Sequence, residues 1–410
     1  MNQPRTALLI TLTGRDRPGV TSRLFGVLAR FPLSITDIEQ VVIRGRLVLG
    51  VLTSCETLPD LTAIHRAVTS LAADLGLDAE ITAGSAEAGA AGVATPGTAR
   101  GQLHVTLIGS PLLPDAIAAV AGRIAASGAN IDRITRLASD PVTCLELDVS
   151  GAEPVSLRDA LAREASHRGV DVAVQPGGLY RRAMRLIVMD VDSTLIQDEV
   201  IDLLAARAGC ADEVAKVTES AMRGEQDFAA SLRERVALLA GLDASVLDSV
   251  RASLRLTPGA QTLIRTLKRL GYKCGIVSGG FTAIIEPLAA ELGIDYVAAN
   301  TLEVSGGKLT GQVLDPVIDR DGKAESLRRF AVTAGVPLSQ TVAVGDGAND
   351  LGMISAAGLG VAFNAKPVVR DAADTALNVP YLDAILYLLG ISRDAVQAAE
   401  SVAATDRIAD

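Results

Sequence analysis

The chain has 410 residues, of which 49% are hydrophobic and 3% aromatic, and its formal net charge is −10. This length allows roughly two to four domains with cores of their own. The acidic balance excludes the basic surface typical of nucleic-acid-binding proteins, and no apolar run is long enough to cross a bilayer. Four scattered cysteines without zinc spacing, and an N-terminus without a signal core, favour reduced thiols and a cytoplasmic location.

The first 84 residues are predicted to form strands and helices in the order βαββαβ. Hydrophobic alternation predicts strands at 6–13, 35–43, 47–55 and 79–82, and helical spacing predicts helices at 20–31 and 61–75. The turn at 14–19 reads Gly-Arg-Asp-Arg-Pro-Gly and joins the first strand to the first helix.

The same order is predicted again after a linker rich in Ala and Gly at 85–101. Strands are expected at 104–108, 131–137, 143–149 and 170–174, with helices at 114–127 and 155–168. Ile35 and Ile38 align with Ile131 and Ile134 at one common offset, which indicates an internal duplication.

The turn at 14–19 resembles that of the ACT domain, a small amino-acid-sensing module. The resemblance implies ferredoxin-like ACT domains at 1–84 and 102–180, which pair side by side and bind an amino acid at their interface near Asp16 and Gly19. The second copy has Gly109 at the corresponding turn but lacks the Asp-Arg-Pro-Gly sequence, which leaves its ligand binding open. A scaffold used only for dimerisation is the alternative.

Longer α/β units are predicted from residue 185 onwards. The apolar run 186–189 is of strand length, and residues 198–256 show several amphipathic helices without a convincing strand. Further strands are predicted at 272–277, 296–299, 341–344 and 359–362, a hairpin at 302–313, and helices at 260–270, 281–292, 322–335, 349–357 and 382–400. This alternation predicts a Rossmann-like parallel sheet with helices on both faces.

Polar residues follow three of these strands: Asp190 and Asp192 after the first, Ser278 after the second, and Asp346 after a third. Ligands bind at the carboxyl ends of strands in open α/β sheets, so we expect these side chains to meet. The three carboxylates are hard oxygen ligands suited to Mg²⁺.

Two further features near these strand ends suit an anion. Gly279 and Gly280 let backbone N–H groups approach one closely, and Lys323, near a helix start, adds a positive charge. Each signal alone is weak, since a Ser-Gly-Gly is usually a turn and a lone Lys usually lies on a solvated face. Their order after successive strands is specific.

The ordered set resembles the motifs of the haloacid dehalogenase superfamily. The resemblance implies a phosphatase domain at 181–398 with a small helical cap at about 197–257, followed by a tail at 399–410. Within the superfamily, residues 192–196 followed by Glu199, with Phe228 and Arg235 in the cap, are similar to the phosphoserine phosphatase family. Without this context, Glu199 and Arg235 would more commonly be helix-surface charges.

This resemblance implies roles for the residues at the strand ends. Asp190 is the nucleophile and a metal ligand, Asp192 is the acid/base and reaches the metal through its backbone carbonyl, and Asp346 is the third ligand. Phosphate contacts are implied for Ser278, Gly279, Lys323 and Asn349, with Asp350 orienting Lys323.

The resemblance also implies how the substrate is selected. Glu199 would pair with the ammonium of phosphoserine, Arg235 with its carboxylate, and Phe228 would make an apolar contact.

The expected function is therefore Mg²⁺-dependent hydrolysis of O-phospho-L-serine through an aspartyl-phosphate, the last step of L-serine biosynthesis. L-serine is expected as product and as feedback inhibitor through the ACT domains, in a homodimer without nucleic-acid or membrane partners. One alternative keeps the fold and acts on another small phosphate ester or transfers phosphate to an alcohol. Another is an amino-acid sensor with a vestigial phosphatase.

Overall fold

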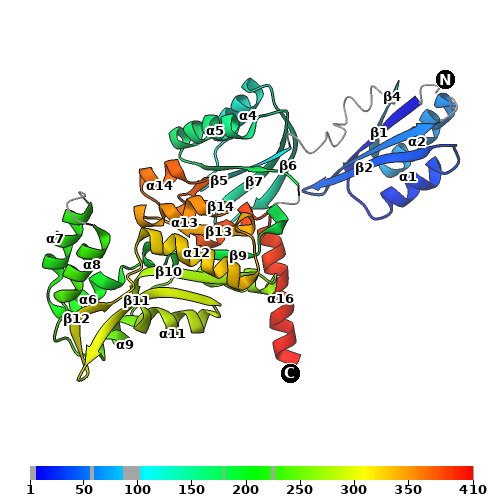
Figure 1. The fold of residues 1–410 in the computed structure, drawn as a ribbon. Coiled ribbons are helices and arrows are strands. Elements are labelled where there is room, and N and C mark those ends of the chain that lie inside the picture. The colour runs from blue at the N-terminus through cyan, green and yellow to red at the C-terminus, as the bar shows by residue number, and fades with distance from the viewer. Residues whose placement is uncertain (1–5, 56–59, 86–101, 179–180, 223–226, 410) are drawn as a thin grey trace. The chain divides into compact units, whose positions relative to one another are not determined.

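The structure, a computed structural model, describes residues 6–55, 60–85, 102–178, 181–222 and 227–409 (Figure 1). The chain divides into two compact units, residues 1–97 and 98–410. No helix in the described ranges is long and apolar enough to span a membrane. Cys144, Cys210 and Cys274 are free cysteines, and Cys55, Cys144 and Cys274 are buried.

The first unit has the predicted βαββαβ order. Its elements are β1 (Thr6–Arg15), α1 (Val20–Leu28), β2 (Ser34–Ile43), β3 (Arg46–Cys55), α2 (Leu61–Leu75) and β4 (Leu77–Ser85). The strands pair antiparallel in the order β2-β3-β1-β4. Helix α2 buries Ile64, Val68 and Leu71 at helical spacing against this sheet, and the Asp60 carboxylate caps its first turn. Strand β2 is an edge strand whose ten residues are all exposed.

The second unit begins with the predicted repeat of this order. Its elements are β5 (Leu103–Gly109), α4 (Pro114–Ala126), β6 (Asn130–Ala138), β7 (Thr143–Ser150), α5 (Pro154–Arg168) and β8 (Asp171–Pro176). Side chains alternate across β5, so that Leu103, Val105 and Leu107 face a core shared with α4 and α5. Ile35 and Ile131 lie on equivalent strands, β2 and β6, as the duplication predicts.

The rest of the second unit contains the predicted parallel sheet. Its strands are β9 (Leu186–Met189), β10 (Lys273–Phe281), β11 (Tyr296–Ser305), β13 (Thr341–Gly345), β14 (Leu359–Phe363) and β15 (Thr375–Leu377), in the order β11-β10-β9-β13-β14-β15. β12 (Lys308–Leu314) pairs antiparallel at the β11 edge. Strand β9 is buried on both faces, because Ile187 and Met189 belong to one core cluster while Leu186 and Val188 belong to another.

Helices cover both faces of this sheet. The helices outside the cap are α10 (Ala260–Arg269), α11 (Thr282–Leu292), α12 (Arg320–Ala334), α13 (Leu351–Ala356), α14 (Pro367–Ala372), α15 (Ile385–Leu388) and α16 (Arg393–Ala409). The cap helices are α6 (Val200–Ala208), α7 (Ala211–Met222), α8 (Phe228–Ala237) and α9 (Val246–Arg251). Figure 1 shows the cap helices gathered beside the β11–β12 hairpin, and backbone hydrogen bonds join residues 241–242 to Leu309.

The structure departs from the predicted elements in five places. The predicted strand at 296–299 and the first hairpin strand are one continuous strand, β11. The predicted helix at 382–400 is broken, since α15 ends at Leu388 and Gly390 has a φ of 76° that a helix cannot accommodate. Strand β10 continues through Ser278, with a shift in its pairing to β11 beyond Val277. Helix α14 and strand β15 were not predicted.

A joint between the two sheets of the second unit was not predicted either. Thr375 of β15 pairs with Ala173 of β8, so that one eleven-stranded sheet runs through both. The buried Asp171 carboxylate accepts hydrogen bonds from the backbone N–H of Asn378 at 2.7 Å, from the Asn378 Nδ2 at 2.6 Å and from the backbone N–H of Val379 at 3.3 Å. Strand pairing and hydrogen bonds therefore join the second βαββαβ repeat directly to the parallel sheet.

Candidate active site

The predicted strand-end residues meet at one edge of the parallel sheet. Asp190 follows β9, Asp346 follows β13, and Ser278 lies near the end of β10. Because β10 and β13 flank β9 on either side in parallel register, their carboxyl ends bring these three residues together. This convergence confirms the expectation from the strand order.

Three carboxylates and one ammonium form the centre of the site. Oxygen atoms of Asp190, Asp346 and Asp350 lie within 4.8 Å of one another. The Lys323 Nζ lies 2.8 Å from Asp190 Oδ1 and 2.6 Å from Asp350 Oδ1. Lys323 is 1% exposed and Asp350 is fully buried, so water screens these charges little.

The charges at this centre do not balance. Burial raises the pKa of Asp190 well above its usual range, and the Asp350 charge adds to the effect while Lys323 opposes it. Burial, with the Asp350 charge second, raises the pKa of Asp346 to about 6. Burial alone would lower the pKa of Lys323, but Asp190 and Asp350 outweigh it and the net shift is upward. One cation among several carboxylates leaves an excess of negative charge, and these hard oxygen donors fit a divalent cation such as Mg²⁺.

Asp350 is held from all sides by the protein. Its Oδ1 accepts from Lys323, while its Oδ2 accepts from the backbone N–H groups of Asp346 at 3.1 Å and Gly347 at 2.9 Å. A Cβ on Gly345 would lie 2.4 Å from the Asp350 carboxyl carbon, so this close approach requires glycine. The geometry suits the predicted task of orienting Lys323.

Asp192 faces a different set of partners. Its Oδ1 accepts from the backbone N–H of Val200 at 2.8 Å, and its Oδ2 accepts from Ser278 Oγ at 2.9 Å. The Gly280 N–H donates to Ser278 Oγ at 2.7 Å. Burial raises the pKa of Asp192, which favours a protonated form able to donate. Its side chain is outside the carboxylate cluster, in keeping with a metal contact through the backbone carbonyl alone.

The three predicted substrate-selecting residues lie beside this centre. Glu199 accepts from Ser193 Oγ at 2.7 Å, and desolvation, with the Asp192 charge second, raises its pKa to about 7. The Glu199 side chain is nevertheless exposed at the rim, so water screens part of these charges. Burial lowers the pKa of the half-buried Arg235, while the charges of Asp202 and Glu199 oppose that shift. The opposite charges of Glu199 and Arg235 therefore lie close enough to influence each other at the rim of the site.

Phe228 and Asn349 each lie against a glycine of the site, Gly279 and Gly347 respectively. A Cβ on Gly279 would lie 3.0 Å from Phe228 Cζ, so this cap residue packs directly over residues 278–280, where the pairing of β10 with β11 is irregular; we call this segment the Ser278 loop. A Cβ on Gly347 would lie 2.2 Å from Asn349 Oδ1. Both side chains reach the neighbourhood predicted for them.

Several residues that support the site escaped the sequence reasoning. The buried Asn300 donates from Nδ2 to the Gly279 carbonyl at 2.8 Å and accepts from Ile318 N–H at 2.7 Å, which fixes the Ser278 loop. Thr194 donates to Asp346 Oδ1 at 3.3 Å. Thr194 belongs to the recognised strand-end motif and could have been found there, whereas Asn300 carries no local signal.

The predicted regulatory residues Asp16 and Gly19 lie in the turn after β1, and Gly109 is the last residue of β5. Asp16 donates its backbone N–H to the Gly45 carbonyl at 2.8 Å, and Gly19 has a φ of 90°. A Cβ on Gly109 would lie 3.1 Å from Leu112 Cα. These contacts explain the turns, and the ligand-binding role stays a prediction.

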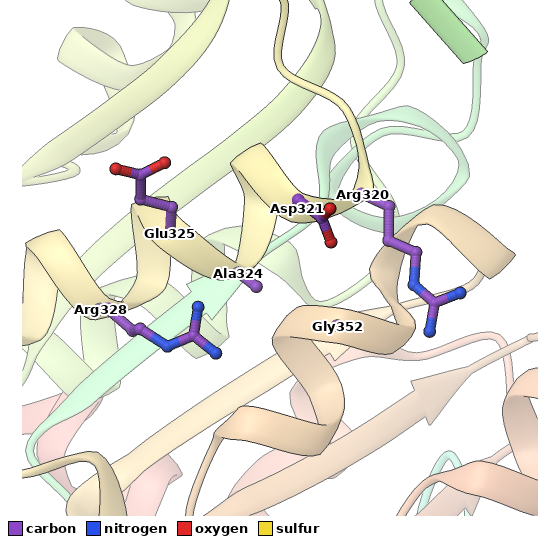
Figure 2. Close-up of a pocket in the computed structure, with 6 residues that line it drawn as sticks. All are labelled: Arg320, Asp321, Ala324, Glu325, Arg328 and Gly352. Atoms are coloured by element: carbon purple, nitrogen blue, oxygen red, sulfur yellow. The ribbon is translucent and has the colours of Figure 1, made fainter. Parts of the chain in front are cut away.

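A separate pocket of about 570 Å³ lies between α12 and α13 (Figure 2). Its lining residues are Arg320, Asp321, Ala324, Glu325, Arg328 and Gly352. None of them belongs to the buried carboxylate cluster, and Lys323 of the same helix points to the cluster instead. We therefore place the candidate active site at the strand ends.

Comparison with known proteins shows which families the two parts of the chain match. Residues 187–355 match the haloacid dehalogenase-like hydrolase family, and residues 6–82 and 103–175 each match the ACT domain. The phosphoserine phosphatase of Streptomyces coelicolor is 60% identical over 397 residues, covering 97% of this chain and 95% of the relative. That of Mycobacterium tuberculosis is 52% identical over 401 residues, covering 97% and 96%.

Two solved structures share the fold. A probable phosphoserine phosphatase from Vibrio cholerae is 37% identical with a TM-score of 0.57, covering 73% of this chain and 90% of that chain. A haloacid dehalogenase family hydrolase from Salmonella enterica is 27% identical with a TM-score of 0.63, covering 70% and 98%.

Proposed function

The chain belongs to the phosphoserine phosphatases of the haloacid dehalogenase-like hydrolase family and carries two ACT domains, and on this premise we propose that it hydrolyses O-phospho-L-serine to L-serine and phosphate with Mg²⁺. The observation that carries the proposal is the buried Lys323 between Asp190 and Asp350. This pairing favours the ionised, nucleophilic form of Asp190 in a site whose burial otherwise favours the neutral acid.

In the first step an oxygen of Asp190 attacks phosphorus while the bond to the serine oxygen breaks. Asp192, whose pKa burial raises so that its protonated form is favoured, gives its proton to the leaving serine oxygen. The product is an aspartyl-phosphate and L-serine. In the second step Asp192 takes a proton from water, whose oxygen attacks phosphorus and releases phosphate from Asp190.

The remaining polar groups stabilise the transferring phosphoryl group. Lys323 and Ser278 supply a positive charge and a hydroxyl, with the Gly279 N–H and Asn349 beside them. Asp190, Asp346 and the backbone carbonyl of Asp192 would hold the Mg²⁺ ion, which when bound neutralises charge on the phosphoryl oxygens.

Substrate selection follows from opposite charges at the rim. Glu199 binds the ammonium of phosphoserine and Arg235 binds its carboxylate, while Phe228 closes over the Ser278 loop. A site with charged groups waiting for both ends of an amino acid rejects esters that lack them, because its partly desolvated charges would stay unpaired.

The catalytic proposal is tested by phosphate release from O-phospho-L-serine. Asp190→Asn should lose the activity, and EDTA should remove it from the wild type until Mg²⁺ is restored. Asp248→Asn is the matched control, because it makes the same chemical change on an 81% exposed carboxylate of the cap. Full activity of Asp190→Asn, or of the wild type in EDTA, would contradict the mechanism.

We also propose that the chain is a homodimer regulated by an amino acid at the first ACT domain. Strand β2 supports this, since among the described residues it is an edge strand paired only with β3, and it exposes Ile38, Val41 and Ile43 by 44%, 46% and 63%. Ile38→Lys should shift the molar mass by light scattering towards the monomer.

Feedback by L-serine has its own test. Asp16→Ala should weaken inhibition by L-serine without changing the uninhibited rate. If inhibition is unchanged in this variant, L-serine acts as a product at the active site.

A further inference from the structure

Two segments connect the catalytic core to the cap helices, residues 194–199 leaving the core and residues 252–257 returning to it. They run antiparallel and are hydrogen-bonded to each other. The Gln197 N–H donates to the Arg255 carbonyl at 2.9 Å, and the Thr257 N–H donates to the Leu195 carbonyl at 3.0 Å. Thr257 Oγ1 also donates to the Thr194 carbonyl at 2.7 Å. The two linkers therefore form one short ribbon.

The Asp198–Arg255 pair lies at the cap end of this ribbon. The Asp198 carboxylate accepts from the backbone N–H of Arg255 at 2.9 Å, and from its Nε at 3.2 Å and Nη2 at 2.6 Å. Exposed ion pairs usually contribute little. Here, however, the carboxylate is only 9% exposed, and one of its three donors is backbone, so the pair fixes the main chain as well as the side chains.

Asp198 of this pair immediately precedes Glu199, which the proposed function assigns to the substrate ammonium. On the other side of Glu199, the Val200 N–H donates to Asp192 Oδ1 at 2.8 Å. The backbone around Glu199 is thus held to the acid/base on one side and to the returning linker on the other. If the Arg255 side chain is lost, the backbone bonds between the two linkers remain, but the Asp198 carboxylate loses the two charge-assisted bonds from the guanidinium that fix its position.

We propose that Asp198 and Arg255 are positioning residues for substrate specificity, which hold Glu199 where the ammonium of the substrate must bind. The inference rests on the proposed function, because it takes Glu199 as the ammonium-binding residue. Neither side chain of the pair bonds to the nucleophile, to Lys323 or to Ser278 among the residues that the structure describes. The pair therefore acts through Glu199 and leaves phosphoryl transfer itself intact.

The test compares two substrates that differ only at the ammonium. The kcat/KM of the full-length protein with Mg²⁺ is measured for O-phospho-L-serine and for its deamino analogue, 3-phosphooxypropionate. Asp198→Ala and Arg255→Ala should each lower the ratio of the two values by roughly tenfold, through KM for phosphoserine, because small misplacements of a binding group are costly. The double variant should lose no more than Asp198→Ala, because the two side chains act as one unit and Asp198→Ala already removes all three bonds, including the one from the backbone N–H of residue 255.

Conservative variants and a control separate positioning from general destabilisation. Asp198→Asn keeps an acceptor for the Arg255 N–H, and Arg255→Lys keeps the charge without the planar fork, so both should give intermediate ratios. Arg251→Ala is the matched control: Arg251 also joins the cap to the core, through Glu291 at 3.1 Å, but lies outside the ribbon. Its ratio should equal that of the wild type. Circular dichroism and thermal midpoints establish that each variant is folded.

The outcomes distinguish this inference from the proposed function. If Glu199→Ala lowers the ratio but the Asp198 and Arg255 variants reduce both substrates equally, or neither, the pair is merely structural and the inference is overturned. If Glu199→Ala leaves the ratio unchanged, the ammonium assignment fails and the inference fails with it. A ratio lowered in Glu199→Ala, Asp198→Ala and Arg255→Ala, but not in Arg251→Ala, supports it.

Discussion

Replacing Asp346 with asparagine should stabilise the metal-free protein at neutral pH. Burial first, and the Asp350 charge second, raise the pKa of Asp346 from 3.8 to about 6. The folded protein therefore binds this proton more tightly than the unfolded chain does. Asparagine keeps an oxygen for the hydrogen bond from Thr194 Oγ1, but it cannot become charged.

The sign and size of the effect follow from linkage. A carboxyl whose pKa is raised by folding contributes stability below its unfolded pKa, and this contribution is lost as pH rises through the folded value. A shift of about two units corresponds to about 3 kcal/mol. Because Asp346 is half-buried and solvent screens part of the interaction, we expect about 1–3 kcal/mol.

Urea unfolding in EDTA, followed by far-UV circular dichroism because the chain has no Trp, measures this difference. As the pH rises from about 4.5 to about 7.5, the free energy of unfolding of Asp346→Asn should increase by about 1–3 kcal/mol relative to that of the wild type. Asp321→Asn, an exposed carboxylate on α12, is the control and should gain nothing. Mg²⁺ should then stabilise the wild type, by about 2.7 kcal/mol at a hundredfold excess over Kd, but not Asp346→Asn. A difference that does not change with pH would refute the electrostatic reasoning.

Three further results are expected. Gly279→Ala should place a methyl group 3.0 Å from Phe228 Cζ and raise KM for phosphoserine, and adding Phe228→Leu should recover part of the loss. Because the pKa of Glu199 is raised to about 7, KM for phosphoserine relative to the deamino analogue should rise as pH falls below that value, and Glu199→Gln should abolish this dependence. Asp171→Ala removes the acceptor for three hydrogen bonds from residues 378–379, so urea unfolding should show a loss of about 2–4 kcal/mol. An unchanged midpoint would show that the joint between the sheets adds no stability.

Most of the fold could be predicted because its signals are local. The βαββαβ repeats, the strand at 186–189 and the helical cap show up as hydrophobic periods of two or 3.6 residues bounded by turn residues. The errors fall where such signals are weak. β15 has only three residues, and the strand at 296–305 contains an Asn-Thr pair that resembles a break.

The convergence of the proposed site residues could also be predicted, since Asp190, Ser278 and Asp346 each follow a predicted strand. Parallel strands in one sheet bring such positions together regardless of the chain between them. The supporting contacts could not be predicted in this way. Asn300 reaches the Gly279 carbonyl from a neighbouring strand, and nothing near Asn300 in the chain indicates that partner.

The order of elements, the duplication and the carboxylates at the strand ends can be read from the amino-acid sequence, because contiguous residues encode strands, helices and motifs. Which distant residues pair depends on how the folded elements pack. Asp198 and Arg255 are 57 positions apart, and Asp171 and Asn378 are 207 apart. Such pairs depend on how whole elements pack, and a single polar residue leaves no periodic trace of its partner. The joint between the two sheets and the Asp198–Arg255 pair are therefore properties of the fold.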